Sequence, residues 1–248
     1  MKKDIIVHES PKSPISETIR LLKTNITFMC KNKKNQILLV TSAAPGDGKS
    51  WVSANLAIAY ANSNKKVLLI DADLRKGRQH KIFGNKNTVG LSDYLVKVDG
   101  MDSLKDQFEV LLGVVFLTKI KGLCLLPSGT VPPNPAELLE TSKIDDLIEI
   151  AKTQFDVIIF DMPPVSIVAD SLLLCKKVDY TVLVAAAEKT KKDMILNAKN
   201  SIEQVGGKIA GVVLNRMPMI KRKGYSKYYS HYDSTYEKKS KKRWIKKR

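Results

Sequence analysis

The feature that most constrains this fold is one short segment, Ala44-Pro45-Gly46-Asp47-Gly48-Lys49-Ser50. An apolar run, residues 37–41, precedes it, and a helical pattern over residues 49–60 begins inside it. A Gly-Lys-Ser between a buried strand and a helix brings backbone N–H groups and the positive end of the helix dipole together, and both attract phosphate. Although Ala43 replaces the usual first glycine, the segment predicts a phosphate-binding loop in which Lys49 contacts terminal phosphates and Ser50 coordinates Mg²⁺.

Five short apolar runs indicate a sheet: residues 37–41, 67–70, 157–160, 181–185 and 209–214. Their nearly continuous hydrophobicity is typical of strands buried on both faces. Helices are expected over residues 16–29, 49–60, 136–152 and 191–205, and no element is assigned within 101–120. The alternation of strands and helices predicts the α/β class, a P-loop NTPase with a mainly parallel central sheet flanked by helices.

Three aspartates lie at the ends of two predicted strands. Asp71 and Asp73 follow the run 67–70, and Asp161 follows the run 157–160. Ligands bind at the carboxyl ends of strands in open α/β sheets, and crowded buried carboxylates need a cation to compensate them. A single aspartate there would more commonly be a turn or N-cap residue, but three behind one phosphate-binding loop indicate a site for Mg²⁺ and a nucleotide.

The positive charge is concentrated at the C-terminal end. The formal net charge is +17, and residues 221–248 contain 12 Lys/Arg against 2 Asp/Glu. We therefore expect one domain over residues 1–216 and a flexible basic tail over 217–248. Such a tail contacts nucleic acid, an anionic membrane or an acidic protein, or stays solvated. Five of the eight tyrosines lie in it, which favours a phosphoacceptor cluster over a folded strand: Tyr225, Tyr228, Tyr229, Tyr232 and Tyr236.

Cysteine usage and hydropathy bear on the compartment. Cys30, Cys124 and Cys175 lie far apart and form no CxxC pair, which indicates reduced, partly buried thiols in a cytosolic protein. No apolar run approaches the ~20 residues that a membrane span requires. Attachment to a membrane is therefore expected only through a partner or the charged tail.

Three segments resemble the Walker A, A′ and B motifs of the bacterial tyrosine kinases (BY-kinases), the capsule and exopolysaccharide autokinases. They are Pro45-Gly46-Asp47-Gly48-Lys49-Ser50, Asp71-Ala72-Asp73-Leu74-Arg75 and Asp161-Met162-Pro163-Pro164. The proline-rich segment 127–139 is similar to a family segment, and 17–26 resembles the family's N-terminal oligomerisation helix, expected over about residues 14–30. The resemblance covers nearly the whole chain, and this order of motifs is highly specific.

The resemblance implies roles for particular residues. The implied ATP contacts are Ala44, Pro45, Gly46, Asp47, Gly48, Lys49, Ser50 and Trp51, with Asn215 and Arg216 on the adenine side. The implied Mg²⁺ ligands are Ser50, Asp71 and Asp161. Asp73 orients or deprotonates the acceptor hydroxyl, a role that the sequence does not separate from that of Asp71, and Asn215 has the alternative of closing a turn.

Arg75 has two alternative roles: it neutralises charge on the transferring phosphoryl group, or it pairs with the acids. The implied oligomerisation residues are Glu17, Arg20 and Lys23, whose alternative is a solvated helix face. Three residues depart from the family pattern: Trp51, Met162 and Lys23 stand where a small hydroxyl residue, Thr or Ser, and arginine are usual.

The resemblance predicts an ATP- and Mg²⁺-dependent protein-tyrosine autokinase that phosphorylates its own tail and regulates capsular or exopolysaccharide biosynthesis and export. Its expected partners are a transmembrane co-polymerase that activates it, further copies in a ring when unphosphorylated, and an opposing tyrosine phosphatase. No nucleic acid is expected, and the location is the cytoplasmic face of the plasma membrane, through the partner. In the ring, the basic tail of one subunit is expected to be attracted to Asp71, Asp73 and Asp161 of the next.

Two other functions remain open from the sequence. The first is a membrane-associated or DNA-partitioning P-loop ATPase, although such proteins usually carry a lysine where this chain has Ala44. The second is a non-catalytic, nucleotide-dependent binding module whose tail contacts nucleic acid or acidic lipid. The tyrosine cluster favours the kinase over both.

Overall fold

The computed structural model describes residues 4–31 and 33–217. Contacts divide the chain into two units, Met1–Arg216 and Met217–Arg248. The first unit contains all the helices and strands of the described residues. The five tail tyrosines lie outside the described residues, so their predicted role stays a prediction.

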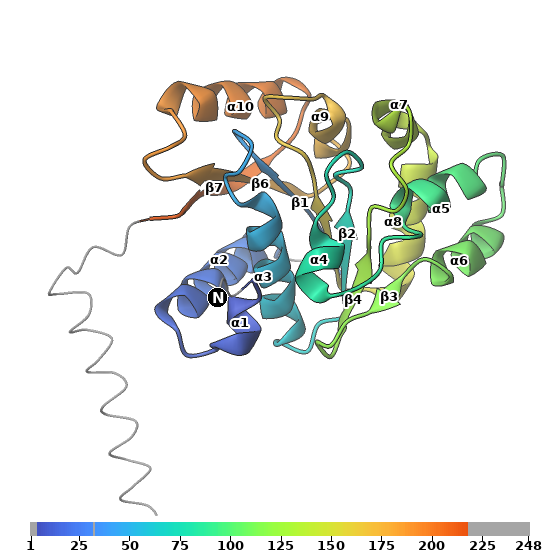
Figure 1. The fold of residues 1–248 in the computed structure, drawn as a ribbon, viewed down its shortest axis with the longest axis horizontal. Coiled ribbons are helices and arrows are strands. Elements are labelled where there is room, and N and C mark those ends of the chain that lie inside the picture. The colour runs from blue at the N-terminus through green and yellow to red at the C-terminus, as the bar shows by residue number, and fades with distance from the viewer. Residues whose placement is uncertain (1–3, 32, 218–248) are drawn as a thin grey trace, which may run out of the picture. The chain divides into compact units, whose positions relative to one another are not determined.

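A central sheet organises the described residues (Figure 1). Its strand order is β3-β4-β2-β5-β1-β6-β7, and every neighbouring pair is parallel except β3 with β4. The strands are β1 Gln36–Ser42, β2 Val67–Asp71, β3 Phe116–Leu117, β4 Leu123–Leu126, β5 Val157–Asp161, β6 Tyr180–Ala186 and β7 Ile209–Asn215. All five predicted strands are present, and the predicted α/β class with a mainly parallel sheet is confirmed.

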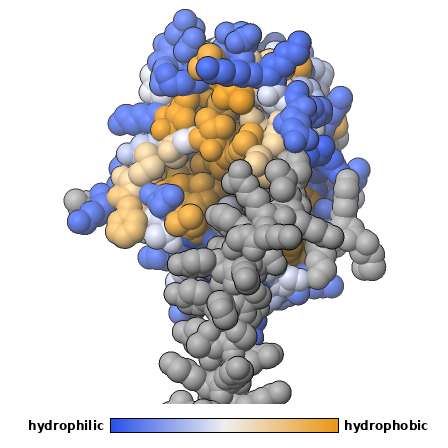
Figure 2. Space-filling view, turned by 90° about the vertical axis from the view of Figure 1, so that its left-hand side faces the viewer, coloured by the Kyte–Doolittle hydropathy of each residue, from blue (hydrophilic) through white to orange (hydrophobic). Residues whose placement is uncertain are grey.

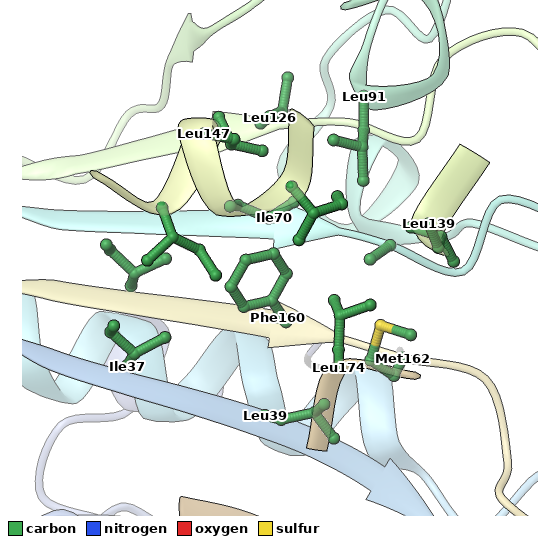
Figure 3. Close-up of a cluster of buried hydrophobic side chains, with 14 of the residues drawn as sticks. Ile37, Leu39, Ile70, Leu91, Leu126, Leu139, Leu147, Phe160, Met162 and Leu174 are labelled. Atoms are coloured by element: carbon green, nitrogen blue, oxygen red, sulfur yellow. The ribbon is translucent and has the colours of Figure 1, made fainter. Parts of the chain in front are cut away.

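Helices cover both faces of this sheet. They are α1 Ile6–Glu9, α2 Pro14–Met29, α3 Lys49–Ala61, α4 Gln79–Phe83, α5 Leu91–Lys97, α6 Leu104–Leu112, α7 Pro135–Glu140, α8 Lys143–Gln154, α9 Asp170–Cys175 and α10 Lys192–Gln204. One face packs against α1, α2 and α3, and the other packs against α5 to α10. Phe160 of β5 lies at the centre of the second layer, with Ile70, Leu126 and Leu174 around it (Figure 3). The continuous apolar runs thus have partners on both faces, as buried parallel strands require.

The register of the central strands sets the position of the acids. Asp71 of β2 lies directly opposite Asp161 of β5, and Asp161 also lies opposite Val40 of β1. Strand β1 leads into the loop that precedes α3. The two strands with terminal acids and the strand with the phosphate-binding motif are therefore neighbours, and their carboxyl ends meet at one edge.

The prediction of one helix over residues 136–152 is wrong. The chain forms two helices, α7 and α8, and the backbone of Thr141 between them is extended at φ −61° and ψ 154°. The Thr141 hydroxyl donates to the Leu138 carbonyl over 2.9 Å. Local side-chain bonds of this kind compete with helix formation, and apolar periodicity alone does not reveal them.

The segment left unassigned, 101–120, contains α6 and the short β3. Ser103 caps α6 by accepting a hydrogen bond from the Asp106 N–H over 3.3 Å, and β3 pairs antiparallel with β4. Strand β4 was not predicted, although Leu123 and Leu125 are buried in it. Its four apolar residues form a run as long as the predicted run 67–70 and are bounded by Gly122 and Pro127, so the sequence contained a strand signal that was missed.

The opposite edge of the sheet is formed by β7. Val212 and Leu214 of this strand are 49% and 51% exposed. Figure 2 shows apolar side chains gathered on this side of the molecule. The described residues thus leave an apolar strand edge uncovered. Separately, no described helix has the length and apolar character that a bilayer span requires.

Candidate active site

The loop between β1 and α3 has the backbone geometry of a phosphate cradle. Gly46 and Gly48 have φ of 82° and 99°, values that L side chains rarely adopt. A Cβ at Gly48 would lie 2.1 Å from Nδ2 of Asn215, so the position accepts only glycine. Gly48 is also the N-cap of α3, which places Lys49 and Ser50 in the first turn, where helix N–H groups are unpaired.

Side chains from distant segments hold this loop in place. The Asp47 carboxylate accepts from the Ala44 N–H over 2.8 Å and from the Thr190 hydroxyl over 2.7 Å. Lys189 donates to the Pro45 carbonyl over 3.0 Å. Sequence reasoning missed both Lys189 and Thr190, because the β6–α10 loop carries no motif that marks them. Two of these contacts, at the Ala44 N–H and the Pro45 carbonyl, hold the loop backbone itself in position.

Asn215, at the end of β7, has two contacts that bear on its predicted role. Its Nδ2 donates to the Asp47 carbonyl over 2.8 Å, and its Oδ1 accepts from the Arg216 N–H over 2.8 Å. Arg216 has φ of 56°, so the chain turns sharply there. Asn215 therefore closes a turn and also braces the phosphate-binding loop, and both Asn215 and Arg216 line the adjoining pocket.

Lys49 lies among the three predicted acids. Its Nζ is 2.8 Å from Oδ2 of Asp73 and 3.8 Å from Oδ1 of Asp161. Burial disfavours the charged ammonium, but the charges of Asp161 and Asp73 outweigh burial and raise the pKa of Lys49. The structure thus brings together the cation and the acids that the sequence placed on three separate strand ends.

Gln79, the first residue of α4, connects these groups and was not predicted. It is fully buried, and its Nε2 donates to Oδ2 of Asp161 over 2.7 Å. The same nitrogen lies 3.0 Å from the Ser50 carbonyl and 3.0 Å from the Ser53 hydroxyl. The Gln79 backbone N–H donates to Oδ2 of Asp71 over 2.8 Å. One residue therefore orients Asp71 and Asp161 and ties both to the start of α3.

Two carboxylate oxygens in this group have no hydrogen-bond partner. They are Oδ1 of Asp71 and Oδ1 of Asp161, and both aspartates are fully buried. Burial and the charge of Asp161 raise the pKa of Asp71 to about 8. Burial likewise raises the pKa of Asp161, with Lys49 acting in the opposite direction. Buried carboxylate oxygens without a hydrogen-bond donor fit the hard-cation chemistry of Mg²⁺.

The described residues form no cluster of three or more His, Cys, Asp or Glu side chains suited to a metal. This agrees with the chemistry of Mg²⁺ at nucleotide sites, where one or two carboxylates share the ion with phosphates and water. Ser50 lies beside the carboxylates, with its hydroxyl 3.4 Å from Lys49 Nζ. The donor set therefore fits a nucleotide-bound Mg²⁺ better than a protein-only metal cage.

A pocket of about 530 Å³ opens in front of the loop. Its lining residues are Asp4, Pro45, Gly46, Gly48, Lys49, Ser50, Trp51, Asp73, Lys76, Arg78, Lys81, Ile82, Pro164, Asn215 and Arg216. Of the three acids only Asp73 lines the pocket, whereas Asp71 and Asp161 are completely buried behind it. The structure thereby separates Asp71 from Asp73, a distinction that the sequence left open.

Arg75 pairs with an acid that the sequence analysis did not consider. Its Nε lies 2.9 Å from Oδ2 of Asp170 and its Nη2 lies 3.1 Å from Oδ1, a bidentate ion pair. Arg75 is not among the pocket-lining residues. Of its two proposed roles, the geometry favours pairing, with Asp170 as the partner rather than Asp71, Asp73 or Asp161.

The three departures from the family pattern have different surroundings. Met162 is fully buried and packs in the hydrophobic cluster near Leu39 and Leu174 (Figure 3). Trp51 lines the pocket. Lys23 of α2 donates to the Ser63 hydroxyl over 2.9 Å. Met162 therefore serves the core, and Trp51 is the departure that bears on ligand binding.

The fold and the site define a nucleotide-binding domain of the P-loop class. The family model described as "CobQ/CobB/MinD/ParA nucleotide binding domain" matches residues 38–228. The chain is 38% identical over 238 residues to tyrosine-protein kinase YwqD of Bacillus subtilis, covering 96% of each chain. It is 39% identical over 228 residues to the putative tyrosine-protein kinase CapB of Staphylococcus aureus, covering 91% of this chain and 94% of that protein.

Solved structures agree with these relatives. The kinase domain of Escherichia coli tyrosine kinase ETK superposes with a TM-score of 0.78 at 35% identity, covering 88% of this chain and 81% of that one. The chimerical protein CapA2B2 gives a TM-score of 0.77 at 40% identity, covering 88% and 92%. The chain belongs to the bacterial tyrosine-protein kinase family within this group of nucleotide-binding domains.

Proposed function

We propose that this protein is an ATP- and Mg²⁺-dependent protein-tyrosine kinase that phosphorylates the tyrosines of its own C-terminal tail. The observation that carries the proposal is the Lys49–Asp73 pair at the pocket wall, with a distance of 2.8 Å between Nζ and Oδ2. A phosphate-binding cation and a carboxylate that lines the pocket then face the same space. An acceptor hydroxyl in that pocket meets both the groups that phosphoryl transfer requires.

The transfer step follows from this placement. The tyrosine Oη attacks the γ-phosphorus of ATP, the bond between them forms, and the bond from the γ-phosphorus to the bridging oxygen breaks. ADP leaves with that electron pair, and the phenolic proton passes to Asp73. Lys49 and the N–H groups of the Gly46–Gly48 loop stabilise charge on the phosphate oxygens.

Ser50, Asp71 and Asp161 would hold Mg²⁺, in line with the unpaired Oδ1 atoms of both aspartates. Held there, the ion would neutralise part of the charge on the nucleotide phosphates. Gln79 keeps the two carboxylates in position through its bonds to Asp161 and Asp71.

The biological setting is proposed from the family. We infer that the kinase regulates capsular or exopolysaccharide biosynthesis and export, with a transmembrane activator and an opposing tyrosine phosphatase. An oligomer of the unphosphorylated protein is proposed through α2, which exposes Leu21 and Phe28 at 61% and 72%. Attachment to the inner face of the plasma membrane would then depend on the activator.

The decisive experiment is incubation with γ-labelled ATP and Mg²⁺, followed by mapping of labelled sites. Label on the tail tyrosines supports the kinase, whereas release of free phosphate without labelled protein supports the alternative P-loop ATPase. Lys49→Met should abolish nucleotide binding and labelling, because the main cation facing the β and γ phosphates is lost. Lys65→Met, on an exposed residue outside the pocket, is the matched control.

Transfer between subunits has its own test. A Lys49→Met chain with an intact tail is mixed with an active chain whose five tail tyrosines are phenylalanine. Label on the Lys49→Met chain demonstrates transfer in trans. If wild-type protein labels its own tail but that chain stays unlabelled, transfer between subunits is rejected.

A further inference from the structure

The electrostatics of the pocket mouth contradict the expected attraction of the basic tail to the site acids. Asp71 and Asp161 are 0% exposed and Asp73 is 4% exposed, and Lys49 already neutralises Asp73. The three acids therefore present almost no negative surface. A lysine-rich segment gains little from them, because its charges stay in solvent at some distance.

The mouth presents cations instead. Lys76, Arg78 and Lys81 are exposed and line the same pocket as Lys49 and Asp73, and we call these three residues the basic rim. None of them forms an ion pair with another residue in the part of the chain that the structure describes. The acid among the exposed lining residues is Asp4, so the rim keeps an excess of positive charge.

The backbone under the rim is held firmly. The Lys76 N–H donates to Oδ1 of Asp73 over 2.9 Å, which links the rim to the acid at the pocket wall. A Cβ at Gly77 would lie 2.2 Å from the Ser128 hydroxyl and 2.9 Å from Oδ2 of Asp71, so the chain packs tightly there. The backbone at Lys76 and Gly77 is therefore held beside Asp73 and Asp71.

The tail sequence contains a complementary pattern. Residues 221–248 hold 12 Lys/Arg but only 2 Asp/Glu, and both acids directly follow a tyrosine, as Tyr232-Asp233 and Tyr236-Glu237. Most of the tail carries charge of the same sign as the rim. At these two places a carboxylate lies one residue from an acceptor hydroxyl, so a tyrosine facing Asp73 brings its acid toward the rim cations.

We propose that the basic rim Lys76, Arg78 and Lys81 selects acceptor tyrosines that are followed by an acidic residue, so that Tyr232 and Tyr236 are phosphorylated before Tyr225, Tyr228 and Tyr229. The inference rests on the proposed kinase function and specifies its substrate: a tyrosine with a carboxylate on its C-terminal side. Selection acts on the acceptor and leaves ATP binding to the loop.

The test uses the full chain and site-resolved initial rates by mass spectrometry. In wild-type protein, Tyr232 and Tyr236 should gain phosphate roughly three- to tenfold faster than the other three, since each exposed ion pair contributes little. The triple variant Lys76→Glu/Arg78→Glu/Lys81→Glu should remove this preference. Lys105→Glu/Lys119→Glu/Lys121→Glu makes the same charge change at exposed positions away from the pocket and should keep it.

Exchanging the charges of the tail acids and the rim tests whether the two interact directly. Asp233→Lys/Glu237→Lys should slow Tyr232 and Tyr236 in the wild-type background and restore their rates in the rim-reversed background. Labelling rates in the rim variant are compared at saturating ATP, with nucleotide affinity measured with a fluorescent ATP analogue, because three reversed charges in the pocket lining also weaken ATP binding. The selective loss at Tyr232 and Tyr236 relative to the other three tyrosines then reports on the acceptor.

Each contrary outcome has a distinct meaning. Equal rates at all five tyrosines in wild-type protein, or no rescue by the charge exchange, overturn the rim proposal while leaving the kinase intact. If the rim variant labels all five tyrosines more slowly by the same factor, and its nucleotide affinity falls by a matching factor, the rim binds ATP phosphates and the proposal of acceptor selection is overturned. If no tyrosine is labelled in any variant, the proposed function itself is wrong.

Discussion

Lys49 Nζ lies 2.8 Å from Oδ2 of Asp73, so the phosphate-binding lysine is paired with the one of the three strand-end acids that lines the pocket. A nucleotide phosphate entering this pocket competes with Asp73 for the same ammonium. The pair therefore couples nucleotide affinity to the group that faces the acceptor.

This coupling predicts opposite effects from one substitution. Asp73→Asn removes the competing charge and its repulsion of phosphate, so ATP affinity should rise roughly three- to tenfold. Tail labelling should fall by about 10²-fold or more, because the proton acceptor is gone. Calorimetric titration and single-turnover labelling measure the two effects separately. Weaker ATP binding by a folded Asp73→Asn protein would contradict the competition.

Gln79 should contribute to the stability of the domain. Gln79→Leu leaves acceptors at Asp161, Ser50 and Ser53 without their donor, and each buried acceptor left unpaired costs ~1–3 kcal/mol. We expect the free energy of unfolding to fall by at least about 2 kcal/mol. Denaturant titration measures it, with the exposed Gln154→Leu as control. An unchanged midpoint would show that Gln79 does not hold this group together.

Arg75 and Asp170 should behave as one unit. Asp170 is 1% exposed, so Arg75→Ala leaves a buried carboxylate unpaired and should destabilise the fold by roughly 1–3 kcal/mol. Asp170→Asn should lower kcat about as much as Arg75→Ala does, and the double variant should add little. Should Arg75→Ala reduce kcat far more than Asp170→Asn, Arg75 would instead act on the phosphoryl group.

The assembly role proposed for α2 has an alternative, since Glu17 and Arg20 already have partners within the subunit. Arg20 is ion-paired with Glu17 and donates to the Pro11 carbonyl. We expect Glu17→Ala/Arg20→Ala to shift the unphosphorylated protein toward smaller species in sedimentation velocity, with circular dichroism unchanged. Lys12→Ala, just before α2, is the control. An identical sedimentation profile would leave the two residues as an intrahelical pair with no assembly role.

Cys30 and Cys175 should be unreactive in the native protein. Burial raises the pKa of Cys175 to about 11, and burial together with the charge of Asp179 raises the pKa of Cys30 to about 11. The thiolate fraction at pH 8 is then very small, so iodoacetamide should modify neither residue until guanidinium unfolds the chain. Intact-mass spectrometry follows the reaction. Rapid native modification of Cys30 would show that the packing of α2 against the sheet opens readily.

The sequence by itself determined the features that depend on neighbours along the chain. Strand runs, the glycines at 46 and 48, and acids at strand ends are local patterns with a period or a fixed spacing. They were sufficient to predict the α/β class, the phosphate-binding loop and the set Lys49, Asp71, Asp73 and Asp161. The predicted helix over 136–152 was wrong because a local bond at Thr141 opposes the periodic pattern.

The tertiary structure decided which of those residues meet, and from which side. Asp71 is opposite Asp161 only because β2 and β5 are neighbours, and strand order is not encoded in any single run. Gln79 reaches Asp161 across 82 positions of sequence, and Arg75 reaches Asp170 across 95. Such pairings depend on packing over the whole domain. The same packing leaves Asp73 at the pocket wall and buries Asp71 and Asp161 behind it.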